Sequence, residues 1–245
     1  MIPKVIHYCW FGNNPLPPLA IKCIDSWKRY LPDYEIRRWD ESNFDYNAIP
    51  YTREAYREKK YAFVSDYARF WILFHHGGLY FDTDVEIVRP MDDIIAECSF
   101  MVCEADAMCG MNYIKVNPGL CLGSEARDPI YAALLNEYAT LSFYLADGSL
   151  NLRTIVEYTT DMLKKFGLQD KTGIQKVGAI TIYPSDYFNP VHYVTKRTHM
   201  TANTRSIHYG AATWSHSNVR TKWKKRIRKM VPEWLLLLFN RLKNR

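Results

Sequence analysis

The N-terminal segment most restricts the fold, because strand-like and helix-like apolar patterns alternate along it. Residues 3–10 (PKVIHYCW) predict a short buried strand that ends before Gly12. Residues 19–31 carry apolar side chains at helical spacing and stop at Pro32, and residues 34–39 predict a second strand. A strand–helix–strand start indicates an α/β domain with a parallel sheet.

The same alternation continues through the middle of the chain. Residues 61–76 predict a long helix, which the Gly77-Gly78 pair ends. A short apolar strand over residues 79–81 comes next, and the tripeptide Asp82-Thr83-Asp84 follows it directly. Further strands are expected over residues 85–88, 100–103, 112–116 and 180–183, and further helices over 130–141 and 152–166.

The net charge of +6 is concentrated at the C-terminus. Residues 218–245 hold ten of the 32 Lys and Arg and one of the 26 Asp and Glu, so they carry +9, and residues 1–217 carry −3. The main part of the chain therefore gives no reason to expect a nucleic-acid partner. We expect one α/β domain over residues 1–217 and a basic tail over residues 218–245.

The tail combines dense positive charge with an apolar stripe. Residues 220–229 contain seven Lys or Arg in ten positions, and Trp223, Ile227 and Met230 recur at helical spacing. This pattern is typical of an amphipathic helix that lies in the headgroup region of an anionic membrane. The alternative is a C-terminal helix that packs on the domain or on a partner subunit. No apolar run approaches the roughly 20 residues of a spanning helix.

The remaining compositional signals favour a cytoplasmic protein. The opening residues lack the features of a secretory signal. The six cysteines contain no C-x-x-C pair and no zinc-like spacing with histidine, so we expect them to be reduced and mostly buried.

Two carboxylates one residue apart, Asp82 and Asp84, follow a buried strand, where they are costly unless something neutralises them. Mn²⁺ or Mg²⁺ does so with one or two protein carboxylates, diphosphate oxygens and water. Such an ion stabilises a departing diphosphate as a Lewis acid. The alternative is a loop whose acids are solvated or cap a turn, because D-x-D is common by chance.

Asp66 and Arg69 lie three residues apart on the preceding helix and share one face. Together they could offer one acceptor and one fork-shaped donor to sugar hydroxyls. The alternative is a local ion pair on the helix surface, worth under about 1 kcal/mol.

Residues 65–69 (SDYAR) and 77–85 (GGLYFDTDV) together resemble the signature of glycosyltransferase family 32, the DXD-containing sugar transferases. That family includes yeast-type mannosyltransferases and many bacterial capsule and exopolysaccharide enzymes, and it is similar to the glucosyltransferase domains of large clostridial toxins. The resemblance extends to residues 2–10, 206–208 and 213–215.

The resemblance implies a GT-A fold, a single nucleotide-binding α/β domain with a mixed, mainly parallel sheet. It implies retaining transfer of a hexose from a nucleotide-sugar, with UDP favoured by the bacterial and toxin-like features. The expected acceptor is a glycan or lipid-linked saccharide in cell-surface polysaccharide synthesis. The expected location is the inner face of a bacterial cell membrane.

The resemblance also implies roles on the donor side. Trp10 would stack on the nucleotide base with the backbone of Cys9 nearby, although Trp10 taken alone suits a core position. Asp66 and Arg69 would hold the donor sugar. Asn117 would line the sugar and acceptor site, or would simply stabilise its turn.

The metal and diphosphate end is expected to draw on two parts of the chain. Asp82 would bind ribose or sugar hydroxyls and reach the metal through water, while Asp84 would coordinate the metal directly. His208 would approach the metal or diphosphate, and Trp214 with Ser215 would close over the donor. Glu104 and Asp106 are candidate acids on the acceptor side.

The sequence departs from the family at two places. Thr213 stands where relatives often have Ser, and residues 152–166 lack a Thr-Gly-Pro pattern that many relatives carry. A different acceptor pocket is one consequence to expect.

Two competing functions remain open. Asp82 and Asp84 also resemble the nucleophile and general acid of haloacid-dehalogenase-type phosphatases, but that motif normally ends the first strand of the fold. A catalytically inactive, transferase-like scaffold at the membrane is the other alternative.

Overall fold

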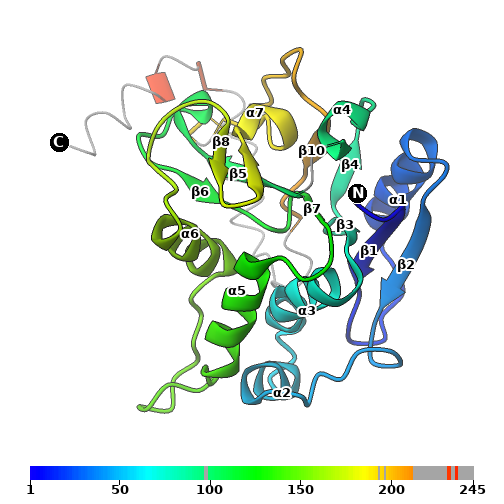
Figure 1. Ribbon diagram of the computed structural model, residues 1–245, viewed down its shortest axis with the longest axis vertical. Coiled ribbons are helices and arrows are strands. Elements are labelled where there is room, and N and C mark those ends of the chain that lie inside the picture. The colour runs from blue at the N-terminus through cyan, green and yellow to red at the C-terminus, as the bar shows by residue number, and fades with distance from the viewer. Residues whose placement is uncertain (97–98, 193, 196, 212–230, 233–234, 237–245) are drawn as a thin grey trace.

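A mixed eight-stranded sheet runs through the computed structural model, which describes residues 1–96, 99–192, 194–195, 197–211, 231–232 and 235–236 (Figure 1). Along the sheet the strand order is β2-β1-β3-β7-β5-β9-β8, and β6 pairs with β5. The strands are β1 (Val5–Cys9), β2 (Glu35–Trp39), β3 (Gly78–Tyr80), β5 (Ser99–Ala105), β6 (Lys115–Val116), β7 (Leu122–Ser124), β8 (Gln175–Val177) and β9 (Ile180–Tyr183).

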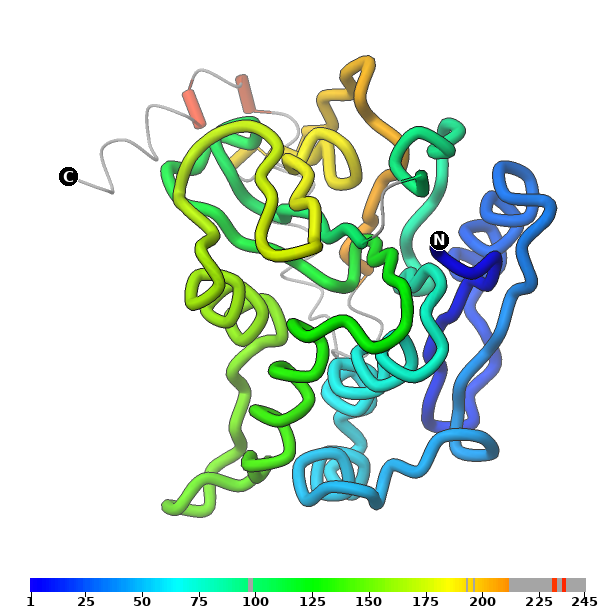
Figure 2. The backbone as a smooth tube through the Cα atoms, in the orientation of Figure 1, coloured from blue at the N-terminus to red at the C-terminus, as the bar shows by residue number. Residues whose placement is uncertain are grey.

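A second, two-stranded ladder joins β4 (Val85–Ile87) to β10 (Ser206–His208). Figure 2 shows how the chain returns late, over residues 206–208, to lie beside this early strand. The helices are α1 (Pro18–Tyr30), α2 (Pro50–Arg57), α3 (Tyr61–His76), α4 (Asp92–Ile95), η1 (Ala107–Cys109), α5 (Pro129–Ala139), α6 (Ile155–Lys165) and α7 (Ser185–Phe188).

The two longest ladders of the sheet are parallel. β1 pairs with β2 along its whole length, and β5 pairs with β9 over Ser99–Val102. Antiparallel pairings join β7 to β3 and β5, β8 to β9, and β6 to β5. The expected α/β fold with a mixed, mainly parallel sheet is confirmed, including its β1-α1-β2 start.

Two apolar cores cover opposite faces of the sheet. Phe100 and Val102 of β5 belong to the core beneath α1 and α7, whereas Met101 and Cys103 belong to the core beneath α2, α3, α5 and α6. Successive side chains of a strand point to opposite faces, so a strand buried on both sides has an unbroken apolar sequence. The five cysteines that the structure describes are buried.

The glycine pair after α3 sets the position of the acidic tripeptide. Gly77 ends the helix at φ +64°, and its N–H donates to the Leu73 carbonyl at 2.9 Å. Gly78 has φ +102°, and a Cβ there would lie 2.7 Å from the Val5 carbonyl oxygen. Only glycine permits this tight change from helix to central strand. Asp82 therefore lies two residues after the end of β3, with Phe81 between them.

Three expectations about elements differ from the structure or lie beyond it. No helix is predicted between residues 39 and 61, yet Pro50–Arg57 form α2, which buries Tyr51 and Ala55. The strand expected over residues 112–116 is shorter in the structure. Only Lys115 and Val116 form it, as β6, because they are the residues of this segment that pair with β5. The amphipathic helix predicted over residues 220–230 lies outside the described residues. Within the described residues, every helix is too short or too polar to cross a bilayer.

Candidate active site

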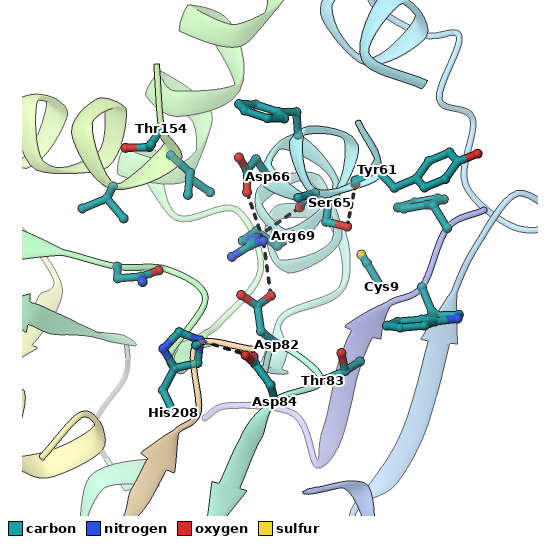
Figure 3. Close-up of a pocket in the computed structure, with 18 of the residues that line it drawn as sticks. Cys9, Tyr61, Ser65, Asp66, Arg69, Asp82, Thr83, Asp84, Thr154 and His208 are labelled. Atoms are coloured by element: carbon teal, nitrogen blue, oxygen red, sulfur yellow. Dashed lines mark hydrogen bonds and ion pairs between the residues drawn. The ribbon is translucent and has the colours of Figure 1, made fainter. Parts of the chain in front are cut away.

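One cluster of polar side chains lies beyond the C-terminal end of β3, an interior strand of the sheet. It consists of Asp82, Asp84 and His208. The two acids lie between β3 and β4, and His208 ends β10, where it pairs with Val85 in the antiparallel register. This ladder brings His208 Nε2 to 3.2 Å from Asp84 Oδ1 (Figure 3). One ligand atom from each of the three residues lies within 4.8 Å of the others, the sole such group among the residues described.

The charges of Asp84 and His208 support each other. Burial raises the pKa of Asp84, but hydrogen bonds from His208 and from the Ala211 N–H (2.8 Å) outweigh it, so the pKa lies below its usual value. Burial lowers the pKa of His208, and Asp84 more than reverses that effect. Two carboxylates and one imidazole suit Mn²⁺ and, through the carboxylates, Mg²⁺. The three residues therefore fit a divalent cation.

Arg69 lies between Asp66 and Asp82. Its Nη2 is 3.1 Å from Asp66 Oδ1 and 3.3 Å from Asp82 Oδ1, and the Arg69 and Asp66 side chains are only 4% and 11% exposed. The alternative of a surface ion pair is therefore wrong, because α3 turns this face into the pocket rather than to bulk solvent. Tyr80 supports the cluster: its hydroxyl donates to Asp82 Oδ1 at 3.2 Å, and its ring lies 4.9 Å from the guanidinium.

Burial dominates the titration of these acids. It raises the pKa of Asp66 to about 7, although Arg69 opposes the shift. Burial also raises the pKa of Asp82, although the Arg69 guanidinium opposes this shift. Burial would lower the pKa of Arg69, but Asp82 and the other neighbouring acidic groups raise it overall, so the guanidinium stays charged. The cluster presents a fixed cation and adjoining oxygen acceptors, a set that can bind sugar hydroxyls.

Trp10 and Cys9 line the same pocket, which has a volume of about 660 Å³. Trp10 is partly exposed and packs against the core beneath α1, and its Nε1 donates to the Asn14 carbonyl at 2.7 Å, so the indole is held in the pocket wall. Burial raises the pKa of the Cys9 thiol to about 12, so it is neutral at physiological pH. A half-exposed indole on a pocket wall can stack on a planar base.

Asn117 both lines the pocket and stabilises a turn. Its Oδ1 accepts the Gly119 N–H at 2.8 Å, and its Nδ2 donates to Glu104 Oε2 at 2.7 Å. Asp106 does not reach the site: it is buried, and its carboxylate accepts the Ser185 N–H and hydroxyl, each at 2.7 Å. The expectation of an acceptor-side role for Asp106 is wrong, because these bonds fix it to the start of α7.

Several residues that line the pocket, or that contact Asp82 from outside it, carry no recognisable signal in the sequence. Tyr80 looked like part of an apolar strand, and Gly119 like a turn residue. Thr154, Ile155 and Val156 line the pocket from the start of α6, far along the chain from the acids. Trp214 and Ser215 lie outside the described residues, so their expected closing role stays a prediction.

The sequence matches a family described as "Glycosyltransferase sugar-binding region containing DXD motif" over residues 17–101. One relative is inositol phosphoceramide mannosyltransferase 1 of Schizosaccharomyces pombe, 28% identical over 41% of this chain and 34% of its own length. The chain thus spans about a third of that relative. An uncharacterized glycosyltransferase of Acanthamoeba polyphaga mimivirus is 24% identical over 78% of this chain and 74% of its own.

Among solved structures, the PaToxG glycosyltransferase is similar, with a TM-score of 0.49 and 19% sequence identity over 67% of this chain and 69% of that chain. The family match covers α3, the glycine pair and the acidic tripeptide, the same segments that build the centre of the pocket. Residues 17–101 are therefore similar to the sugar-binding region of the DXD-containing glycosyltransferases.

Proposed function

We propose that this protein transfers a hexose, with retention of configuration, from a UDP-hexose to a saccharide or lipid-linked saccharide, with Mn²⁺ or Mg²⁺ bound. The observation that carries the proposal is the convergence of Asp82, Asp84 and His208 beside the buried Asp66–Arg69 pair. Retention and the UDP nucleotide rest on the family resemblance.

In this proposal each part of the pocket has one task. Trp10 binds the base, and Arg69 with Asp66 orients the sugar hydroxyls. Asp84, Asp82 and His208 hold the cation, which supplies Lewis-acid stabilisation to the departing diphosphate. These side chains position the donor and stabilise charge, and neither task requires a protein nucleophile.

The wider context is also part of the proposal. The fission-yeast relative is described as acting on inositol phosphoceramide, which supports a lipid-linked acceptor here. We place the reaction in cell-surface polysaccharide synthesis on the inner face of a bacterial membrane. No nucleic acid takes part, since residues 1–217 carry −3.

Donor hydrolysis without acceptor tests the function. UDP- and GDP-sugars are incubated with and without Mn²⁺, using the wild type, Asp84→Ala and the surface control Asp33→Ala. We expect one UDP-hexose to turn over, dependent on both Mn²⁺ and Asp84 and unaffected at Asp33. Turnover of GDP-sugars alone would overturn the UDP assignment. The absence of both turnover and Mn²⁺-dependent nucleotide binding would overturn transfer itself.

The basic tail is proposed to bind anionic lipid. Its seven Lys and Arg over residues 220–229 would each contribute about 1 kcal/mol near such a surface. The measurement is co-sedimentation with phosphatidylserine vesicles at low and high salt. A full-length variant with these seven residues changed to Gln should stay in the supernatant, and equal sedimentation of the two proteins would contradict the proposal.

A further inference from the structure

The pocket has two walls on opposite sides of the acid and arginine cluster. Figure 3 shows Cys9 and Tyr61 on one side and Thr154 on the other. The first wall is the one assigned above to the nucleotide. The second is the first turn of α6, where Thr154, Ile155 and Val156 line the pocket. We call these three residues the α6 wall; donor binding, as proposed, gives them no task.

The α6 wall is held rigidly in place. Thr154 caps the helix, with its hydroxyl and its N–H both donating to Glu157 Oε2 at 2.9 Å. One turn further on, Thr160 Oγ1 accepts the Val116 N–H at 2.9 Å. Val116 immediately precedes Asn117, which lines the pocket beside the cluster. The wall and Asn117 therefore form one preorganised surface.

The chemistry of this wall is apolar and uncharged. The nearby charge of Arg153 is directed elsewhere, because its guanidinium pairs with Asp161 and lies 4.3 Å from the centre of the Tyr158 ring. The wall itself offers two branched aliphatic side chains and the Thr154 hydroxyl. Leu152, just before it, is 56% exposed. Such a surface does not suit phosphates, but it suits the apolar part of a ligand.

We propose that the α6 wall is the acceptor subsite and that it takes a saccharide hydroxyl carried on an apolar body, as in a glycolipid. This inference rests on the proposed function and specifies its acceptor. The acceptor oxygen forms a bond to C1 of the donor sugar while the bond from C1 to the diphosphate oxygen breaks. The electron pair leaves with the diphosphate, and a diphosphate oxygen takes up the hydroxyl proton.

The test compares transfer with hydrolysis in the same protein. Probes are methyl and octyl glycosides of glucose, galactose, mannose and N-acetylglucosamine, with the donor that the hydrolysis assay identifies. Val156→Trp fills the wall, and Val156→Thr keeps its shape while adding a hydroxyl. Lys165→Trp places the same bulk on an exposed position of the same helix and serves as the control.

For the wild type we expect an octyl glycoside to have a KM at least tenfold lower than its methyl counterpart. Val156→Trp should lower the ratio of transfer to hydrolysis at least tenfold, and Lys165→Trp should leave it unchanged. Val156→Thr, which tests the same point if the larger substitution fails to fold, should reduce the octyl preference.

An unchanged ratio of transfer to hydrolysis in Val156→Trp, together with an unchanged octyl preference in Val156→Thr, would overturn the subsite. Hydrolysis without transfer to any glycoside would overturn the acceptor class. Loss of donor hydrolysis in the wild type would instead refute the proposed function, so the two failures are distinguishable.

Discussion

The backbone of Gly119 lies directly against the carboxylate of Asp82. The Gly119 carbonyl accepts the Asp82 N–H at 3.0 Å, and a Cβ at residue 119 would collide with Asp82 Oδ2 and lie 3.0 Å from Arg69 Nη1. The turn after Asn117 therefore leaves room for the acid only because residue 119 has no side chain.

We predict that Gly119→Ala displaces Asp82 and lowers metal-dependent donor hydrolysis at least tenfold. Overpacking of this kind costs about 1–3 kcal/mol of unfolding free energy. Gly148→Ala is the control: its Cβ meets nothing within 4 Å, and only its φ of +81° opposes the change. Kinetics and urea unfolding of both variants check the prediction, and full activity in Gly119→Ala would contradict it.

Removal of Arg69 leaves the buried carboxylate of Asp66 and the partly exposed carboxylate of Asp82 without their cation. We predict that Arg69→Met abolishes donor turnover and lowers the free energy of unfolding by about 3–5 kcal/mol. The double variant Arg69→Met/Asp66→Asn should recover part of that stability but no activity, because one uncompensated charge is gone. Urea denaturation measures both. A loss below about 1 kcal/mol would match a surface ion pair instead.

Trp10 supplies the one aromatic wall assigned to the base. Loss of base stacking costs about 1–3 kcal/mol, so Trp10→Ala should weaken UDP binding by roughly 5- to 150-fold. Trp10→Phe should retain part of the affinity, since a smaller ring still stacks. Calorimetric titration of UDP in the presence of Mn²⁺ gives the values. Equal affinity in the wild type and Trp10→Ala would remove Trp10 from the donor site.

His7 makes stability depend on pH away from the active centre. Burial, with a smaller contribution from Arg37, lowers the pKa of His7 to about 4. Its hydrogen bonds require the neutral ring, because Trp39 Nε1 can only donate, to Nδ1 at 3.0 Å, which leaves the proton on Nε2 for the Gly77 carbonyl at 3.0 Å.

Between pH 6.5 and 4 the unfolded chain binds a proton at residue 7 that the folded chain does not. Stability from this residue is therefore fully present above pH 6.5 and is lost as pH falls toward 4, by about 3 kcal/mol in all. His7→Gln can keep both bonds without titrating, so its unfolding free energy should fall less over this range. Urea unfolding curves of the wild type and His7→Gln at pH 4.5 and 7.5 measure the loss of unfolding free energy in each protein, and equal losses would contradict the prediction.

The central features of the pocket were predictable because their signals are local. The helical period of residues 61–76, the glycine pair and the apolar strand before Asp82 all act within one segment of chain. Asp66 and Arg69 share a face because they are three residues apart on one helix. Even so, the sequence alone could not distinguish a surface ion pair from the buried one, since burial depends on what packs against α3.

The remaining parts of the site depend on pairings between distant segments. His208 is next to Asp84 because β10 pairs with β4 in one particular register, and a shift by one residue would turn its side chain away. The α6 wall reaches the pocket because α6 is attached to β6. The Thr160 hydroxyl on this helix accepts a hydrogen bond from the N–H of Val116, the residue before Asn117.

The sequence by itself determined the α/β class, the start of the sheet, and the acids and arginine of the centre, because periodicity, glycine and charge act over a few neighbouring residues. Only the tertiary structure decided how deeply Arg69 is buried, how close His208 comes to Asp84, that Asp106 serves α7, and that the start of α6 lines the pocket. These depend on ladder registers and helix packing, in which residues far apart in the chain must satisfy one geometry together.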